Sequence, residues 1–166
     1  MGKTTEAVEV KNPDIVFTQS GPEGLEQIAP LWIKLRRHHK ERSPWFKDDF
    51  DTVTWEMRKT GLLEKSAKGE LLVHLAKDKG VLIGYCVSSI DTEKQGEIES
   101  IFIEKEYRKH HIGDGFMKTA LKWMDGQGVK RKIIGVAVGN EEAFGFYEKY
   151  GFYPRVTLLR QKEKNH

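Results

Sequence analysis

Residues 97–117, EIESIFIEKEYRKHHIGDGFM, join a strand, a basic loop and the start of a helix, and this stretch decides the fold. Polar and apolar residues first alternate and then become continuously apolar. This pattern predicts a strand over 97–103 that is half exposed at its start and buried at its end. From Gly113 to about Asp125, apolar residues recur at helical spacing. The strand therefore leads through a short loop into a helix.

The beginning of this helix has the chemistry of an anion-binding site. The amides of a first helical turn have no partner within the helix, and the helix dipole adds positive potential there. Arg108 and Lys109 in the preceding loop add charge, and Gly113 would let an anion approach the backbone closely. Many strand–loop–helix connections contain glycine only to fit the turn, so this stretch alone leaves both explanations open.

The rest of the chain divides into further strands and helices by periodicity and by Gly and Pro breakers. We expect strands at residues 14–20, 71–76, 81–90, 133–138 and 156–160, and helices at 23–40, 52–60, 113–125 and 141–150. Pro30 should kink the first helix or split it in two, and Gly61 should stop the second.

The order of these elements predicts the fold class. Meandering strands in the middle of the chain imply antiparallel pairing, and the later strand–helix–strand unit implies a parallel crossover. We expect an α/β (α+β) fold with a mixed, mostly antiparallel sheet of six to seven strands, flanked by about four helices. Residues 1–13 should be a polar tail and residues 14–166 a single domain.

Composition narrows the class of protein. Of the 166 residues, 38% are hydrophobic and 32% charged, and the net charge of +3 is too small to indicate a nucleic-acid partner. Cys86, the only cysteine, lies in an apolar run, which indicates a small buried hydrophobe and a reducing compartment. No run approaches the ~20 apolar residues of a membrane span, and the polar start lacks a secretory signal. We therefore expect a cytoplasmic protein with no membrane partner.

A second motif, GNEEAFGFYEKYGF, occupies residues 139–152. Asn140 should cap the helix that follows. Phe144 and Tyr147 are three residues apart, so they should lie on one face of that helix.

Together the two motifs resemble those of the GCN5-related N-acetyltransferase (GNAT) family. YRKHHIGDG at 107–115 is similar to the family's acetyl-CoA-binding loop, Gln/Arg-x-x-Gly-x-Gly/Ala, and NEEAFGFYEKYGF is similar to its later Asn-x-x-Ala-x-x-x-Tyr-Glu-x-x-Gly-Phe motif. Arg108 and Gly113 match the loop pattern, whereas His111 stands where its first glycine is expected. The resemblance implies an acyl-CoA N-acyltransferase-like fold.

The resemblance also implies a function and a set of site residues. The expected activity is transfer of an acetyl group from acetyl-CoA, as co-substrate, to a primary amine, by direct attack in a ternary complex without a metal. Cofactor-binding residues carried over from the family are Ile101, Phe102, Ile103, Arg108, Lys109, His110, His111, Ile112, Gly113, Asp114, Asn140, Phe144 and Tyr147.

Three side chains are candidates for the chemistry itself. By resemblance, Tyr147 would protonate the coenzyme A thiolate, and the amide of Ile103 would polarise the acetyl carbonyl. Glu97 and Glu99 are two residues apart on a strand, so both point to one side. The family places a glutamate base at one of these two positions, and we favour Glu99. Each could equally be an ordinary exposed carboxylate.

The acceptor is less defined by the sequence. His38, His39, Trp45, Phe46 and the acidic residues Asp48, Asp49 and Asp51 could line a pocket for a small cationic amine, or could belong to a solvated loop. A protein acetyltransferase for lysines or N-terminal amines is the alternative enzyme. A non-catalytic acyl-CoA-binding module, favoured by His111, is the alternative outside enzymes. A homodimer is possible by analogy with the family.

Overall fold

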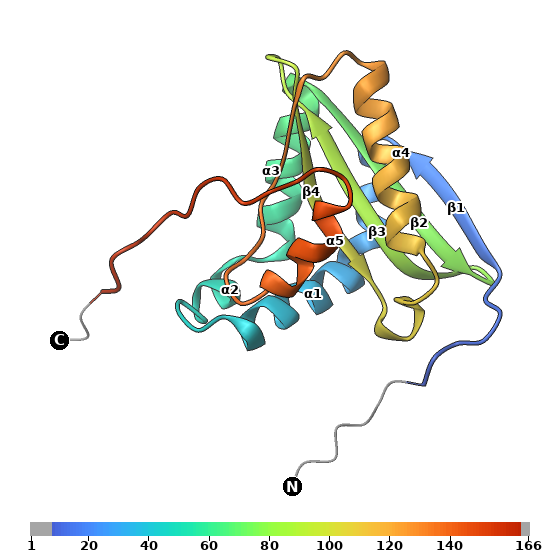
Figure 1. Ribbon diagram of the computed structural model, residues 1–166, viewed down its shortest axis with the longest axis horizontal. Helices are drawn as coiled ribbons and strands as arrows, with labels where there is room; N and C mark the ends of the chain where they lie inside the picture. The colour runs from blue at the N-terminus through green and yellow to red at the C-terminus, as the bar shows by residue number, and fades with distance from the viewer. Residues whose placement is uncertain (1–7, 164–166) are drawn as a thin grey trace, which may run out of the picture.

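The fold is built on one five-stranded sheet, seen in a computed structural model that describes residues 8–163. The strands lie in chain order and are β1 (Ile15–Ser20), β2 (Glu70–Asp78), β3 (Val81–Ile90), β4 (Gln95–Ile103) and β5 (Arg131–Ile134). The first four strands pair antiparallel, and β5 pairs parallel with β4 (Figure 1). The predicted mixed, mostly antiparallel sheet is therefore confirmed.

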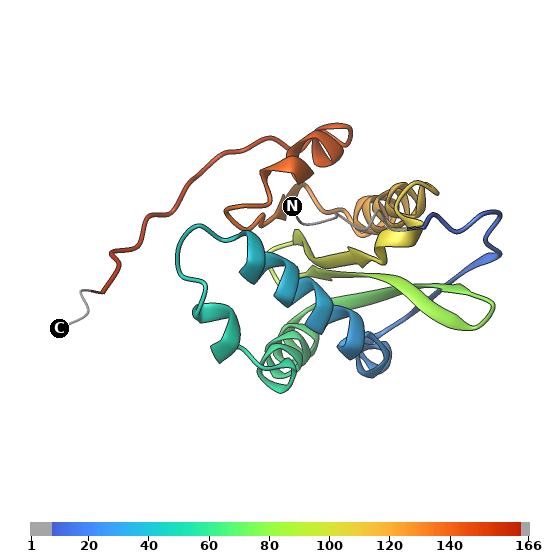
Figure 2. The ribbon, with the colours of Figure 1, turned by 90° about the horizontal axis from the view of Figure 1, so that it is seen from below.

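Helices cover both faces of this sheet (Figure 2). One face carries α1 (Leu25–Arg42) and α3 (Trp55–Lys68), and the other carries α4 (Ile112–Gly126) and α5 (Phe144–Glu148). A short helix α2 (Asp49–Thr52) and three 3-10 turns, η1 (Pro22–Gly24), η2 (Lys105–Tyr107) and η3 (Glu141–Ala143), complete the described elements.

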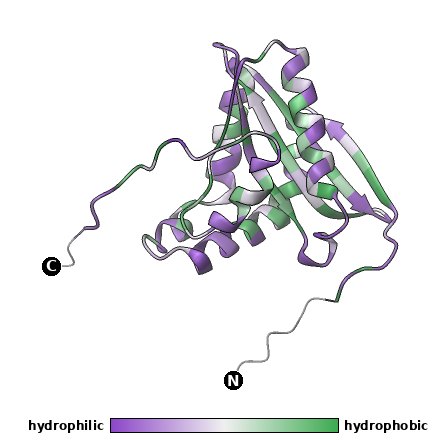
Figure 3. Ribbon diagram, viewed as in Figure 1, coloured by the Kyte–Doolittle hydropathy of each residue, from purple (hydrophilic) through white to green (hydrophobic). Residues whose placement is uncertain are grey.

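Each face of the sheet has its own hydrophobic core. On the α1 and α3 face, Leu25, Ile28 and Leu62 pack with Tyr85. On the α4 face, Phe116 and Met117 pack with other buried side chains that include Cys86. Hydrophobic residues run along β2 and β3 between these cores, whereas the α1–α2 region is mostly hydrophilic (Figure 3). The predicted burial of Cys86 is confirmed, and burial raises the pKa of its thiol to about 12.

The predicted number of strands is too high. Five strands form instead of six to seven, because the predicted strand at 156–160 has no neighbour to pair with among the described residues. This segment runs away from the sheet (Figure 1), and Leu158 and Leu159 are 89% and 88% exposed. Arg160 instead pairs with Asp49 at 2.7 Å and stacks on Phe46. A strand needs a partner, and apolar residues in the tail do not supply one.

Two helices continue past predicted breakers. Of the two outcomes predicted at Pro30, a kink or a split, the split does not occur, because Ile28 and Leu31 on either side are buried in the core and hold the helix together. Gly61 does not end α3, because the next residue, Leu62, is completely buried and the helix continues to Lys68. In both cases tertiary packing outweighs local propensity.

Other boundaries differ without changing the arrangement. β5 ends at Ile134 rather than at 138, and the expected helix at 141–150 divides into η3 and the short α5. Within residues 8–163, no helix has both the length and the apolar character needed to cross a membrane. Residues 1–7 of the predicted polar tail lie outside the described residues.

Candidate active site

The site begins where β4 and β5 separate. β5 pairs with β4 only along Gln95–Ile98, whereas β3 stays paired with β4 as far as Ile103. The register between β3 and β4 shifts at Glu99, because Ser88 pairs with Ile98 and Val87 pairs with Ser100. This is a β-bulge, an extra residue that bends a strand and increases its twist. The second half of β4 therefore has one open edge.

Peptide groups line that edge. The amide of Glu104 donates to the carbonyl of Ile83 at 2.8 Å, and Phe102 is paired with Tyr85 on β3. Because hydrogen-bonding groups alternate in direction along a strand, those of Ile101 and Ile103 point away from β3, into the gap left by β5. The peptide groups of Phe102 point toward β3 instead. Of the three residues expected to bind the cofactor through their main chain, only Ile101 and Ile103 therefore have peptide groups facing the gap.

The N-terminus of α4 adjoins this edge. Its N-cap is His111, which has the left-handed backbone conformation φ 57° and ψ 22°. His111 can therefore replace the expected loop glycine, at the cost of an uncommon conformation for a residue with a side chain. The carbonyl of His111 accepts from Gly115, and no acceptor within residues 8–163 takes the amides of Ile112, Gly113 and Asp114. Unpartnered amides at a helix start are suited to an anion.

Gly113 lies in a tightly packed place. A Cβ atom at this position would lie 3.1 Å from Cζ of Phe146 and 3.3 Å from Cδ1 of Ile103. The phenyl ring of Phe146 is itself held by Tyr147 and Tyr150, with ring centroids 5.2 and 5.6 Å away. The glycine thus lets α4, α5 and the end of β4 meet at one point.

Asp114 links the start of α4 to the residues that follow α5. Its carboxylate accepts from the Tyr150 hydroxyl, from Nζ of Lys149 at 2.9 Å and from Nδ1 of His111 at 3.1 Å. The hydrogen bond from Tyr150, followed by that from Lys149, holds the pKa of Asp114 well below its ordinary value. A carboxylate in the first turn also complements the helix dipole.

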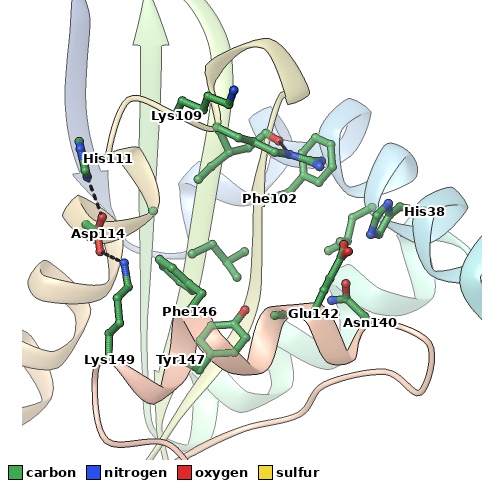
Figure 4. Close-up of a pocket in the computed structure, with 16 residues that line it drawn as sticks. His38, Phe102, Lys109, His111, Asp114, Asn140, Glu142, Phe146, Tyr147 and Lys149 are labelled. Atoms are coloured by element: carbon green, nitrogen blue, oxygen red, sulfur yellow. Dashed lines mark hydrogen bonds and ion pairs between the residues drawn. The ribbon is translucent and has the colours of Figure 1, made fainter. Parts of the chain in front are cut away.

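A pocket of about 650 Å³ opens between these elements, a size typical of small-molecule sites. It is lined by Leu35, His38, Ile101, Phe102, Ile103, Arg108, Lys109, His111, Gly113, Asp114, Asn140, Glu142, Ala143, Phe146, Tyr147 and Lys149 (Figure 4). α1 closes one end, and the start of α4 closes the other. The Arg108 guanidinium donates to the Ile103 carbonyl at 3.0 Å and stacks on Phe102.

Tyr147 supplies a proton donor to the pocket. Its side chain comes from α5 and is 8% exposed, and Figure 4 shows the hydroxyl pointing into the pocket. Burial, assisted by the neighbouring Cys86, raises the pKa of Tyr147 above its ordinary value. The phenol therefore stays protonated at neutral pH.

Ten of the predicted site residues meet in this pocket. They are Ile101, Phe102, Ile103, Arg108, Lys109, His111, Gly113, Asp114, Asn140 and Tyr147. The expected cap at Asn140 is wrong, because its side chain makes no capping hydrogen bond. Instead, the Glu141 carboxylate accepts from the amide of Gly139 at 2.8 Å.

Five predicted site residues do not line the pocket. Ile112 is buried in the core on the α4 face of the sheet, and Phe144 is 37% exposed. His110 turns toward Glu9, with Nε2 and Oε1 separated by 3.8 Å. The remaining two are Glu97 and Glu99.

The two glutamates share one side of β4, as expected, but they face α3. Nζ of Lys65 contacts both carboxylates, at 3.1 Å for Glu97 and at closer range for Glu99. Glu99, whose side chain is 2% exposed, also accepts from Ser89 at 2.6 Å and pairs with Arg58 at 3.2 Å. Burial alone would raise the pKa of Glu99, but the hydrogen bonds from Lys65 and Ser89 and the neighbouring cations lower it. The bulge turns both carboxylates out of the pocket.

Sequence reasoning missed several residues of the pocket, among them Leu35, Glu142, Phe146 and Lys149. It named His38 only as one member of a loose acceptor group. Leu35 and His38 are three residues apart on α1, so their helical spacing could have linked them. Which face of α1 meets β4 depends on long-range packing.

Comparison with known proteins agrees with this geometry. A family profile described as "Acetyltransferase (GNAT) family" matches residues 32–152. The match covers most of the chain, and the protein belongs to the GNAT acetyltransferase family. The resemblance inferred from the two motifs is thereby confirmed.

Individual relatives are more distant. Mycothiol acetyltransferase of Corynebacterium efficiens is 24% identical over 157 residues, 89% of this chain and 49% of that protein. The chain thus spans about half the length of this curated relative. PaiA N-acetyltransferase of Thermoplasma acidophilum, in complex with coenzyme A, superposes with a TM-score of 0.65 at 20% identity, over 87% of this chain and 92% of that chain.

A third relative was solved with an amine. An aminoglycoside acetyltransferase from an uncultured soil metagenomic sample, in complex with sisomicin, gives a TM-score of 0.62 at 13% identity. The similarity covers 90% of this chain and 97% of that chain. At these identities the two solved structures establish a common fold.

Proposed function

We propose that this protein transfers an acetyl group from acetyl-CoA to the primary amine of a small molecule, in a ternary complex. One observation carries the proposal. The open edge of β4 ends at the unpartnered amides of α4, and Tyr147 points into the pocket between them. Such an arrangement suits a substrate with an extended amide-containing arm, an anionic diphosphate and a thioester.

The residues present fit acetyl-CoA. The peptide groups of Ile101 and Ile103 can pair with the amides of the pantetheine arm as an added strand would. The amides of residues 112–114 can bind the diphosphate, with positive charge from Arg108 and Lys109 nearby. His111 still contributes its backbone to this turn, because its left-handed conformation is the one a glycine would adopt.

The same residues define the chemistry. The amide of Ile103 would stabilise negative charge that develops on the acetyl oxygen as a neutral amine attacks. Tyr147 would give its proton to the departing thiolate, since a buried phenol remains protonated until it is needed. Catalysis would rest on positioning two substrates and on this proton donor.

A small-molecule acceptor is favoured over a protein. The acceptor end of the pocket is bounded by α1 and η3, where Arg42 and Glu142 form an ion pair at 2.8 Å. The Glu142 carboxylate lines the pocket and would attract a cationic amine. The aminoglycoside-bound relative supports the same substrate class.

The proposal is tested by release of free thiol from acetyl-CoA in the presence of an amine panel and a matched panel of lysine-containing and N-terminal peptides. We expect turnover with members of the amine panel. Activity confined to peptides would replace the small-molecule acceptor with a protein. Saturable acetyl-CoA binding without thiol release from any acceptor would indicate a binding module.

A further inference from the structure

We propose that His38 is the base that takes the proton from the acceptor amine. The inference rests on the proposed acetyl transfer and deepens it by naming a catalytic residue from α1. An amine with an ordinary pKa near 10 is protonated at neutral pH and must lose a proton before it can attack. The two carboxylates expected to do this do not line the pocket, whereas His38 does.

His38 lies at the acceptor end of the pocket. It follows Leu35 by three residues on α1, and both side chains line the pocket together with Tyr147 (Figure 4). The ring is partly exposed, and within residues 8–163 it has no hydrogen-bond partner. Imidazoles are the commonest general bases in enzymes. The ring nitrogens of His38 are therefore open to a bound amine and to solvent.

The other groups able to accept a proton have partners of their own, whether they line the pocket or, like Glu99, lie outside it. Asp114 is held by three hydrogen bonds, and the His111 ring, 88% exposed, is bound to it at the α4 end. Glu142 is paired with Arg42. Glu99 is 2% exposed and fixed on the α3 side of β4.

The surroundings of His38 suit a proton acceptor. Figure 4 shows the Glu142 carboxylate on the same side of the pocket as the ring, where it would stabilise an imidazolium. The opposing charges are Arg42, which pairs with Glu142, and Arg108 in the pocket wall. The neighbouring His39 ring, with its centroid 6.0 Å from that of His38, has a pKa that burial and His38 lower, which favours its neutral form. At the far end the pocket is lined by the charged or titratable side chains of Lys109, His111, Asp114, Lys149 and Tyr147.

The proton balance closes with two residues. His38 accepts one proton from the substrate ammonium, and the nitrogen lone pair then forms a bond to the acetyl carbonyl carbon. The carbon–sulfur bond breaks, its electron pair goes to sulfur, and sulfur receives the proton of Tyr147. The second proton of the amine returns to Tyr147, and His38 releases its proton to solvent. The products are the amide, coenzyme A thiol and one proton.

The test compares His38→Gln with Arg37→Gln, a control at the preceding residue of the same helix, which is exposed and does not line the pocket. Two acceptors are used. One is the best primary amine of the panel, which is protonated at neutral pH. The other is its aminooxy analogue, in which oxygen replaces the adjacent methylene and leaves the nitrogen neutral. Acetyl-CoA affinity and kcat/KM are measured for each protein.

We expect His38→Gln to lower kcat/KM for the amine by about 10²-fold or more at pH 7. The loss should be within about 5-fold for the aminooxy analogue, which needs no base before attack. Acetyl-CoA affinity should be unchanged, and the loss for the amine should shrink as the pH is raised toward the pKa of the amine. Arg37→Gln should resemble the wild type.

Equal losses for both acceptors would reveal a structural role and overturn the inference, as would wild-type kinetics. If His38→Gln bound acetyl-CoA poorly, His38→Asn would give the same comparison. If the wild-type protein released no thiol with any amine, the proposed acetyl transfer would be wrong. If the wild type were active but His38→Gln had the same kinetics, only the role of His38 would be wrong.

Discussion

The guanidinium of Arg58 donates hydrogen bonds to two oxygens of Glu99, the main-chain carbonyl at 2.9 Å and the carboxylate at 3.2 Å. One side chain of α3 thus holds both the backbone and the side chain of the residue at which β4 bulges. Because β5 leaves β4 at the same place, these contacts support the geometry of the open edge. We therefore expect Glu99 to stabilise the bulge that gives the open edge its geometry.

Glu99→Gln should be less stable than the wild type at pH 7, by about 1–3 kcal/mol, because the buried carboxylate that accepts from Lys65, Ser89 and Arg58 becomes a neutral amide. The pKa of Glu99 is lowered in the folded state from its ordinary 4.5. Its stabilising contribution is therefore present above pH 4.5 and is lost as the pH falls through the folded-state value.

Urea unfolding between pH 3 and pH 7 measures this effect. The loss of stability on acidification should be smaller in Glu99→Gln than in the wild type. Glu97→Gln is the matched control, because Glu97 is more exposed and, among residues 8–163, its carboxylate pairs only with Lys65. Its stability should change by less than about 1 kcal/mol. Identical behaviour of the two variants would contradict the role given to Glu99.

His111→Val should be less stable than His111→Gly by about 1–2 kcal/mol, since only valine meets the steric penalty of a left-handed backbone. Both changes remove the imidazole and its bond to Asp114, so the difference isolates the conformation at φ 57°. Chemical denaturation measures it. We expect acetyl-CoA affinity to be kept in His111→Gly and weakened in His111→Val. A valine variant as stable as the glycine variant would refute the argument.

Gly113→Val should weaken acetyl-CoA binding and lower the free energy of unfolding by about 1–3 kcal/mol, because the added methyl groups collide with Phe146 and Ile103. Gly126→Ala at the other end of α4 is the control, since a Cβ atom added there would meet nothing within 4 Å. Calorimetric titration with acetyl-CoA and thermal unfolding check both. Wild-type affinity for acetyl-CoA in Gly113→Val would contradict the assignment of the loop before α4 to the acetyl-CoA site.

Tyr147→Phe should lower kcat by about 10²-fold or more and leave acetyl-CoA affinity within a few fold, because only the proton donor is lost. Tyr153→Phe, at a residue that is 68% exposed and does not line the pocket, should have no effect. Single-turnover acetyl transfer and equilibrium binding separate the two quantities. Unchanged turnover in Tyr147→Phe would exclude it from the reaction.

Local patterns predict the elements whose burial is periodic. β4 and α4 could be anticipated because alternation and helical spacing are visible within a single window of sequence. The shared orientation of Glu97 and Glu99 is also correct, since both contact Lys65. Their position relative to the pocket was not predictable, because it depends on a β-bulge, and no residue in this stretch is of a type that predicts one.

Features set by distant contacts could not be predicted. The continuation of α3 through Gly61 depends on the burial of Leu62 against the sheet, and the missing strand at 156–160 depends on the absence of a partner among the described residues. His38 joins Tyr147 in one pocket although the two are far apart in the sequence, a proximity that follows from how α1 and α5 pack against the end of β4.

The open edge of β4 affects which amino-acid substitutions this protein can tolerate. Recognition through peptide groups depends on the path of the backbone, so the side chains of Ile101 and Ile103 can be exchanged for others of similar size without loss of the hydrogen-bonding pattern. Such a groove constrains the path of the backbone more than the identity of the side chains. Solved structures with only 13–20% sequence identity share the fold of this chain.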